Sequence, residues 1–221
     1  MMRKFIAKII SPFLQYFVKH YFVKPRTYRY KKIKIKVLPG VFFPHFTLST
    51  KLLLQFLETK ELHKKTFLEL GCGTGIISVF AAQKGAETTA TDINPKAIEN
   101  VTLNAKTNHV KVLSILSDLF TAIPQQQFNY IIINPPYYPK KPKNKAEEAW
   151  FCGENFEYFE KLFASITPYF NSTSEVYMIL SEDCNVERIK SIAFKNKLLF
   201  TTILEKRKYR EMNYIYCINK K

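Results

Sequence analysis

Three glycines at alternating positions follow an apolar run, in the pattern of a buried strand that turns into a helix over a ligand. The run extends from Phe67 to Leu70, and glycine occupies positions 71, 73 and 75. Glycine removes the Cβ atoms that would keep a ligand away from the backbone, and it permits the positive φ values of a tight turn. Asp92 follows about 20 residues later, at the end of a second strand-like run, where a carboxylate can bind ribose hydroxyls.

A third strand-like run ends in a more specific group of residues. A run of isoleucines is followed by Asn134, Pro135, Pro136 and Tyr137. A proline turn at the end of a strand would explain the two prolines, but it would not explain an asparagine and a tyrosine at their flanks. We therefore expect these four residues to have a functional role.

Together these features resemble the class I S-adenosylmethionine-dependent methyltransferases that act on a planar nitrogen. The residues that carry the resemblance are Glu69 to Gly75, Asp92, Asp118 and Asn134 to Tyr137. Within this class the chain looks most like the HemK/PrmC type, which methylates a glutamine side-chain amide in peptide-chain release factors. This closer likeness lies in residues 91–97, 134–137 and 149–155, and the whole resemblance runs from about Gly40 to the C-terminus.

The resemblance implies that S-adenosylmethionine is the cofactor. The glycine loop would lie against its methionine part and Glu69 would receive its ammonium group, while Asp92 would accept the ribose hydroxyls. Asp118 would accept the adenine amine, with Ile93 and Leu119 on either side of the ring. Each carboxylate could instead be a cap or a surface charge, but ligand sites in such sheets gather at the carboxyl ends of the strands. The expected cofactor-binding residues are Glu69, Gly71, Cys72, Gly73, Gly75, Asp92, Ile93, Asp118, Leu119 and Asn134.

The resemblance also implies roles in methyl transfer for Asn134, Pro135, Pro136 and Tyr137. An amide or aromatic amine is a poor nucleophile because its lone pair is delocalised. The Asn134 side-chain oxygen and the Pro135 carbonyl can hold its two N–H bonds and draw the nitrogen toward pyramidal geometry in the transition state. Tyr137 can stack on a flat amide or base. The chemistry requires no metal, because the sulfonium donor already carries a good leaving group.

The same geometry serves two substrates, which the sequence leaves open. One is a protein glutamine amide, as in a release factor, and the other is an exocyclic base amine in ribosomal RNA, transfer RNA or DNA. A non-catalytic adaptor that binds RNA or membrane through its basic N-terminus is the alternative from another class. Methyltransferases of the class that this chain resembles place an aromatic loop over the cofactor and the target. The resemblance therefore implies that place for the loop from Pro39 to Phe46.

Positive charge is concentrated at the N-terminal end. Residues 1–40 hold eleven Lys or Arg and no Asp or Glu, so they account for +11 of the formal net charge of +16. Such a field favours a polyanionic partner, either nucleic acid or an anionic membrane surface, and its effect falls with salt. Solubility alone could also explain it. The sequence gives no indication of the oligomeric state.

The composition favours a folded domain in the cytoplasm. With 47% hydrophobic and 15% aromatic residues, the chain is not of the disordered class. No apolar run approaches the roughly 20 residues of a membrane span. The four cysteines, Cys72, Cys152, Cys184 and Cys217, show no C-x-x-C pairing, which predicts neither a zinc site nor a disulfide framework.

The order of the elements predicts an α/β fold: a doubly wound, Rossmann-like class I methyltransferase sheet, mostly parallel with an antiparallel edge strand, plus a basic N-terminal helix and strand. We expect residues 1–40 to be an extension and residues 41–221 to form the methyltransferase domain. In the extension, apolar spacing from Ile6 predicts a helix, and strict alternation over residues 32–37 predicts a strand with its lysines outward. Further strands are expected at 66–70, 87–91, 110–116, 128–133, 175–180, 198–204 and 213–218, and helices at 49–57, 76–83, 95–105, 155–168 and 186–193.

Overall fold

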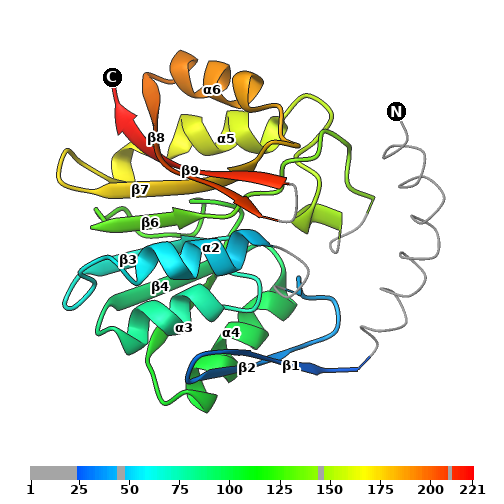
Figure 1. The fold of residues 1–221 in the computed structure, drawn as a ribbon, viewed down its shortest axis with the longest axis vertical. Coiled ribbons are helices and arrows are strands. Elements are labelled where there is room, and N and C mark those ends of the chain that lie inside the picture. The colour runs from blue at the N-terminus through cyan, green and yellow to red at the C-terminus, as the bar shows by residue number, and fades with distance from the viewer. Residues whose placement is uncertain (1–23, 44–47, 144–146, 209–210) are drawn as a thin grey trace.

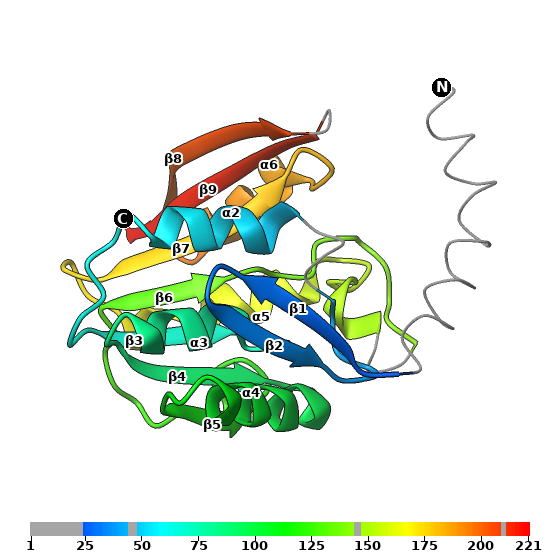
Figure 2. The same ribbon diagram turned by 60° about the horizontal axis from the view of Figure 1, so that its bottom comes forward.

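The computed structural model describes residues 24–43, 48–143, 147–208 and 211–221 of the chain. These residues form a two-stranded hairpin and a seven-stranded sheet with helices on both faces (Figures 1 and 2). The helix expected from Ile6 lies outside the described residues.

The sheet has the order β5-β4-β3-β6-β7-β9-β8. Its first five strands are parallel, and β9 pairs antiparallel with both β7 and β8. This confirms the expected doubly wound sheet with antiparallel pairing at one edge. The antiparallel strand β9 is second from that edge, and β8 closes the sheet. The strands are β3 (Thr66–Leu70), β4 (Glu87–Asp92), β5 (Val112–Leu116), β6 (Tyr130–Ile133), β7 (Glu175–Ser181), β8 (Leu198–Lys208) and β9 (Glu211–Lys220).

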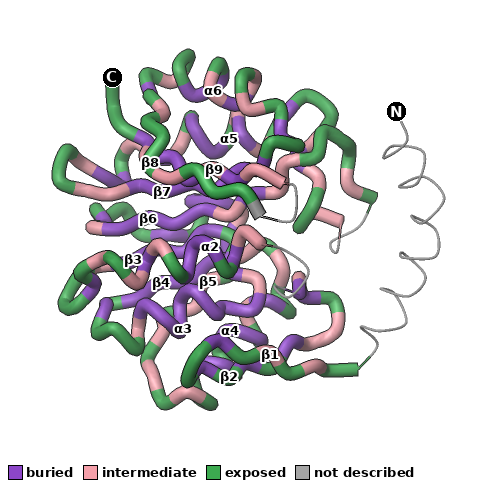
Figure 3. The backbone as a smooth tube through the Cα atoms, viewed as in Figure 1, coloured by how far each residue is buried: buried purple, intermediate pink, exposed green. Residues whose placement is uncertain are grey.

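Alternate residues of the central strands face two separate cores. Leu68, Ile131 and Met178 pack under α5 and α6, whereas Phe67 and Ile132 pack under α2 and α3 with the hairpin. Both sets are buried because a strand turns successive side chains to opposite faces, and the buried colour in Figure 3 follows the inner strands. The helices are α2 (Leu48–Leu57), α3 (Ile76–Gln83), α4 (Pro95–Thr107), α5 (Glu157–Ser165) and α6 (Val186–Lys195), with short 3-10 turns η2 (Glu147–Ala149) and η3 (Thr167–Tyr169).

The hairpin of β1 (Arg26–Tyr30) and β2 (Ile33–Val37) packs against α3 and α4. The sequence predicted β2, and its lysines are exposed while its aliphatic residues are buried. The sequence analysis did not predict β1. The division of the chain at residue 40 stays a prediction, although the hairpin shares the core beneath α2 and α3.

Three asparagines one turn apart hold β2 in place, two of them on α4 and the third, Asn108, at its C-cap. The side-chain amide of Asn104 accepts from Lys36 N at 2.8 Å and donates to Lys36 O at 2.8 Å. Asn108 does the same for Lys34, at 3.2 and 2.8 Å. Asn100 accepts from Leu38 N at 2.9 Å. The amides therefore supply the hydrogen bonds that a neighbouring strand would give, and β2 runs antiparallel to α4.

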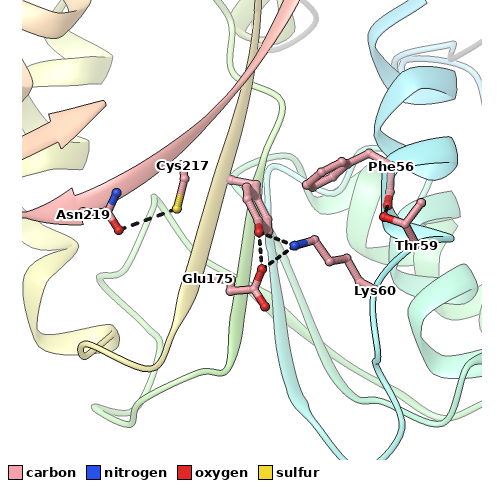
Figure 4. A network of polar contacts seen from close by, with 7 residues as sticks. Phe56, Thr59, Lys60, Glu175, Cys217 and Asn219 are labelled. Carbon is pink, nitrogen blue, oxygen red and sulfur yellow. Dashed lines mark hydrogen bonds and ion pairs between the residues drawn. The ribbon is translucent and has the colours of Figure 1, made fainter. Parts of the chain in front are cut away.

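At the opposite end of the sheet from the strands' carboxyl ends, a polar cluster ties α2 to β7. Lys60, just after α2, contacts Glu175 and Tyr177 OH, each at 2.6 Å, and Tyr177 also donates to Glu175 (Figure 4). This cluster fixes α2, whose first residues line the cavity described below.

Among the described residues, no helix is both long enough and apolar enough to span a membrane.

Candidate active site

A cavity of about 340 Å³ opens at the carboxyl ends of β3, β4, β5 and β6. Because parallel strands end at the same edge of a sheet, the polar residues that follow each strand meet there. The loop after β2 and the start of α2 form another wall, and residues 148–153 with α5 complete the lining.

The loop after β3 forms the floor of the cavity through its backbone. Gly71 and Gly73 have φ values of 72° and 51°, which residues other than glycine rarely adopt. Gly71 N and Cys72 N donate to Thr91 O at 2.9 and 2.8 Å, so the turn is anchored to β4. A Cβ on Gly71 would meet no atom within 4 Å, which leaves that position open to a ligand.

Gly75 has a different position from the other two glycines. It does not line the cavity, and a Cβ there would lie 2.2 Å from Val101 Cγ2 on α4. The absence of a side chain at Gly75 therefore lets the loop and α4 pack closely, a structural task within the cofactor-binding set expected from the sequence.

Glu69 lies at the end of β3 with its side chain buried. Its Oε2 accepts hydrogen bonds from Ser78 N, at 2.8 Å, and from the Ser78 hydroxyl. Burial outweighs these hydrogen bonds and, with the nearby charge of Asp92, raises the pKa of Glu69 to about 8. A cation in the cavity would stabilise the ionised carboxylate.

Asp92, at the end of β4, receives two backbone hydrogen bonds. Gly73 N donates to its Oδ2 and Asn94 N to its Oδ1, each at 2.9 Å. Burial raises the pKa of Asp92, and these backbone donors oppose the shift. Asn94 caps α4 through Lys96 N and donates to Gly40 O at 3.0 Å. The carboxylate is thus held at the rim by the glycine loop and the helix cap, and the Asn94 side chain links that cap to the loop after β2.

The loop after β5 brings Asp118 and Leu119 to the same cavity. Asp118 is half-exposed and forms an ion pair with Lys161 of α5. Leu119 is buried with a φ of 52°, and Ile93 is 36% exposed across the cavity. An acceptor and two aliphatic side chains are available for a planar heterocycle.

Asn134 follows β6, which lies beside β3. Leu70 of β3 pairs with Ile133 of β6 in the parallel register. The residues that come next, Gly71 and Asn134, therefore start from neighbouring positions at the same edge of the sheet. All four residues from Asn134 to Tyr137 line the cavity. Burial is the largest of the causes that raise the pKa of Tyr137. The Tyr137 hydroxyl is therefore neutral at physiological pH. Its ring packs against Tyr138 with centroids 4.7 Å apart.

The cavity also contains residues that the expected set does not include. Phe42, in the loop after β2, packs on Trp150 with ring centroids 4.9 Å apart, and both line the cavity. Tyr158 of α5 lines it near Asp92 and Asp118. Trp150 belongs to the 149–155 segment used for the family resemblance, whereas the sequence around Tyr158 reads only as an apolar helix face. Among the described residues, no cluster of His, Cys, Asp or Glu could hold a metal ion.

Comparison with known proteins gives a consistent result. A family model described as the methyltransferase small domain matches residues 32–199. The chain is 32% identical over 173 residues to a Methanocaldococcus jannaschii protein whose assigned activity is protein N5-glutamine methylation, covering 74% of this chain and 85% of that protein. It is 27% identical over 177 residues to a ribosomal RNA small subunit methyltransferase C of Buchnera aphidicola, covering 79% of this chain and 51% of that protein. A T. thermophilus 16S ribosomal RNA methyltransferase, solved with AdoMet and guanosine, has a TM-score of 0.64 at 17% identity, covering 90% of this chain and 50% of that one.

Proposed function

The chain belongs to the methyltransferase small-domain family, and from that premise we propose that it methylates the side-chain amide nitrogen of a glutamine in a protein. It is a class I, HemK-like methyltransferase with S-adenosylmethionine as its cofactor. The meeting of Asn134 and Pro135 with the glycine loop in one cavity, through the adjacent strands β6 and β3, carries the part of the proposal that concerns a planar nitrogen. The sequence match favours glutamine as the source of that nitrogen.

The cofactor would lie across the carboxyl ends of β3, β4 and β5. Gly71 to Gly73 would pass beneath its methionine part, and Glu69 would hold its ammonium group. Asp92, fixed by its two backbone donors, would accept the ribose hydroxyls. Asp118 would accept the adenine amine. S-adenosylmethionine supplies a methyl group on a sulfonium, and the protein aligns the acceptor nitrogen with it.

Asn134 and Pro135 would act on the acceptor. A glutamine amide has two N–H bonds in the plane of its π system, and two fixed acceptors can hold both. Holding them as the nitrogen becomes pyramidal stabilises the transition state more than the ground state. Tyr137, neutral and packed on Tyr138, would form a flat wall beside the amide.

The extent of the sequence match favours glutamine over a nucleobase. The relative assigned to glutamine methylation is matched over 85% of its length, whereas the ribosomal RNA relative is matched over 51%. The chain thus spans about half of the latter protein. A release factor is the first protein to test.

A second candidate is methylation of an exocyclic base amine in RNA. It is favoured by the positive charge of residues 1–40 and by the ribosomal RNA relative. The non-catalytic adaptor is disfavoured, because Gly71, Asp92 and Asn134 all line one cavity.

The experiment that tests the proposal follows a radiolabelled methyl group. The protein is incubated with labelled S-adenosylmethionine and an extract that lacks the enzyme, and the product is treated with protease or nuclease. Protease-sensitive label that yields N5-methylglutamine on hydrolysis supports the proposal. Nuclease-sensitive label supports the second candidate, and no label with intact cofactor binding contradicts both.

A further inference from the structure

The outer face of the β1–β2 hairpin carries exposed cations in register. Arg29 lies directly opposite Lys34, and Thr27 lies opposite Lys36, so these side chains share one face of the hairpin. Arg29, Lys34 and Lys36 are exposed, and we call them the hairpin row. Like charges placed directly opposite each other destabilise a strand pair. The repulsion between these cations falls when an anion binds between them.

Few acidic groups surround the hairpin row. Residues 24–43 contain no Asp or Glu. At the turn, Lys31 pairs with Glu58 at 2.6 Å, and the nearest helix, α4, carries the exposed Glu99 beside its lysines. In the described part of the chain, no ion pair joins the hairpin row to an acid.

The hairpin row leads to the cavity. Because β2 runs antiparallel to α4, its C-terminal end lies at the start of that helix. Asn94 and Ala97, at that end of the helix, line the cofactor-binding cavity. The chain continues from Lys36 into Gly40 and Phe42, which line the cavity. Lys96, exposed at the start of α4, lies against Gly40, with its Cδ 3.3 Å from the place where a Cβ would be. Positive charge therefore continues from Lys34 past Lys36 to the rim.

We propose that the hairpin row and Lys96 bind the phosphates of an RNA strand and guide it to the rim of the cavity. Lysines two residues apart on a strand are about 6.8 Å apart, which gives a line of separate charges suited to a backbone of repeated phosphates. Contacts of this kind fix position and not base sequence. A membrane fits less well, because the row ends at a cavity that must admit the methyl acceptor. The inference goes beyond the proposed function, since the strand can be the substrate or can lie beside the protein that is methylated.

The test measures binding of a fluorescein-labelled oligouridylate to the full chain by anisotropy over a salt series. The variant is Arg29→Gln/Lys34→Gln/Lys36→Gln. Its matched control, Lys65→Gln/Lys195→Gln/Lys197→Gln, removes the same charge from exposed lysines near the starts of β3 and β8, away from the cavity. We expect the hairpin variant to lose at least about tenfold in affinity and about two units of salt slope, as three lost contacts to a single strand imply. The control should lose less than about threefold.

Three outcomes would overturn the inference. These are equal losses in both variants, unchanged RNA binding in the hairpin variant, and tighter binding to vesicles of anionic phospholipid than to RNA. Matching unfolding curves and S-adenosylmethionine affinity in the two variants exclude a folding defect, and Lys34→Arg/Lys36→Arg should retain binding. The RNA readout is independent of methyl transfer, so failure of the proposed function would leave this result interpretable.

Discussion

Asn104 of α4 makes with Lys36 of β2 the pair of hydrogen bonds that one strand makes with another. It accepts from Lys36 N and donates to Lys36 O, each at 2.8 Å, and also donates to Thr74 O in the glycine loop at 2.9 Å. One buried side chain thus joins the hairpin, the helix and the glycine loop. The loop that follows β2 can line the cavity because this joint fixes its start.

Replacing Asn104 should therefore affect both folding and cofactor binding. Asn104→Ala leaves Lys36 N–H and Thr74 O without their partner, while Lys36 O keeps the hydrogen bond from the Asn100 side chain. Each buried group left unpaired costs about 1–3 kcal/mol. We expect the free energy of unfolding in urea to fall by about 3 kcal/mol and S-adenosylmethionine affinity to fall several-fold. Asn108→Ala, at the less buried end of the same row, is the control and should cost about 1 kcal/mol with unchanged cofactor affinity. Equal effects of the two substitutions would contradict the joint role of Asn104.

Gly71 and Gly75 should respond differently to alanine. Gly75→Ala places a methyl group 2.2 Å from Val101 Cγ2, in addition to the strain of its φ of 73°, so we expect a loss of about 3 kcal/mol or more in unfolding free energy. Gly71→Ala meets only the strain, about 1–2 kcal/mol, but should weaken cofactor binding. Adding Val101→Ala to Gly75→Ala should recover part of the stability. A double mutant no more stable than Gly75→Ala would refute steric conflict as the cause.

The sequence predicted the central strands and helices well because their ends are punctuated by strong local features. Glycine ends β3, and Asn94 with Pro95 starts α4, as the structure shows. The hairpin gave no such feature: its turn places Lys31 at a φ of 51°, a conformation usually taken by glycine or asparagine. Strand β1 was missed for that reason.

The sequence predicted those residues of the candidate site that lie at the ends of strands, and it did not predict those that reach the cavity from a helix. Asp92 ends β4 and Asn134 follows β6, so the parallel sheet alone brings them together. Tyr158 reaches the cavity from a helix whose docking depends on tertiary packing, and its sequence resembles any apolar helix face. Likewise, the spacing of Asn100, Asn104 and Asn108 is visible in the sequence, but their partner, the backbone of β2, is not.

Glu69 should make cofactor binding depend on pH. Its pKa of about 8 in the folded protein lies above the ordinary value of 4.5, so the native state favours the protonated acid. The protonated Glu69 side chain therefore contributes to the free energy of unfolding. This contribution is fully present below about pH 4.5 and is lost as the pH rises toward 8. In the proposed binding mode, the ammonium group of S-adenosylmethionine pairs with the ionised Glu69 carboxylate, so binding near pH 7 should release a proton. Affinity should then rise with pH between 6 and 8 by at most about tenfold per unit.

Calorimetry in buffers of different ionisation enthalpy measures that proton directly. Glu69→Gln keeps the size of the side chain and removes the titration, so proton release should disappear and the affinity should become independent of pH over this range. Proton release that persists in Glu69→Gln would assign it to another group, such as Asp92, whose pKa is also raised by burial.

Asn134 and Asp92 should separate catalysis from cofactor binding. Asp92→Ala removes the carboxylate held by Gly73 N and Asn94 N, so S-adenosylmethionine affinity should fall by at least about tenfold while the fold is retained. Asn134→Ala removes the side-chain oxygen that, in the proposed mechanism, holds the acceptor amide as its nitrogen changes geometry. It should lower kcat by about 100- to 1,000-fold, with cofactor affinity nearly unchanged. Asn134→Asp keeps a side-chain oxygen at the same place and should retain more activity than alanine. Single-turnover transfer to a glutamine peptide and calorimetric titration of the cofactor distinguish the two effects, because a fully active Asn134→Ala enzyme is incompatible with a mechanism in which this oxygen holds the acceptor amide.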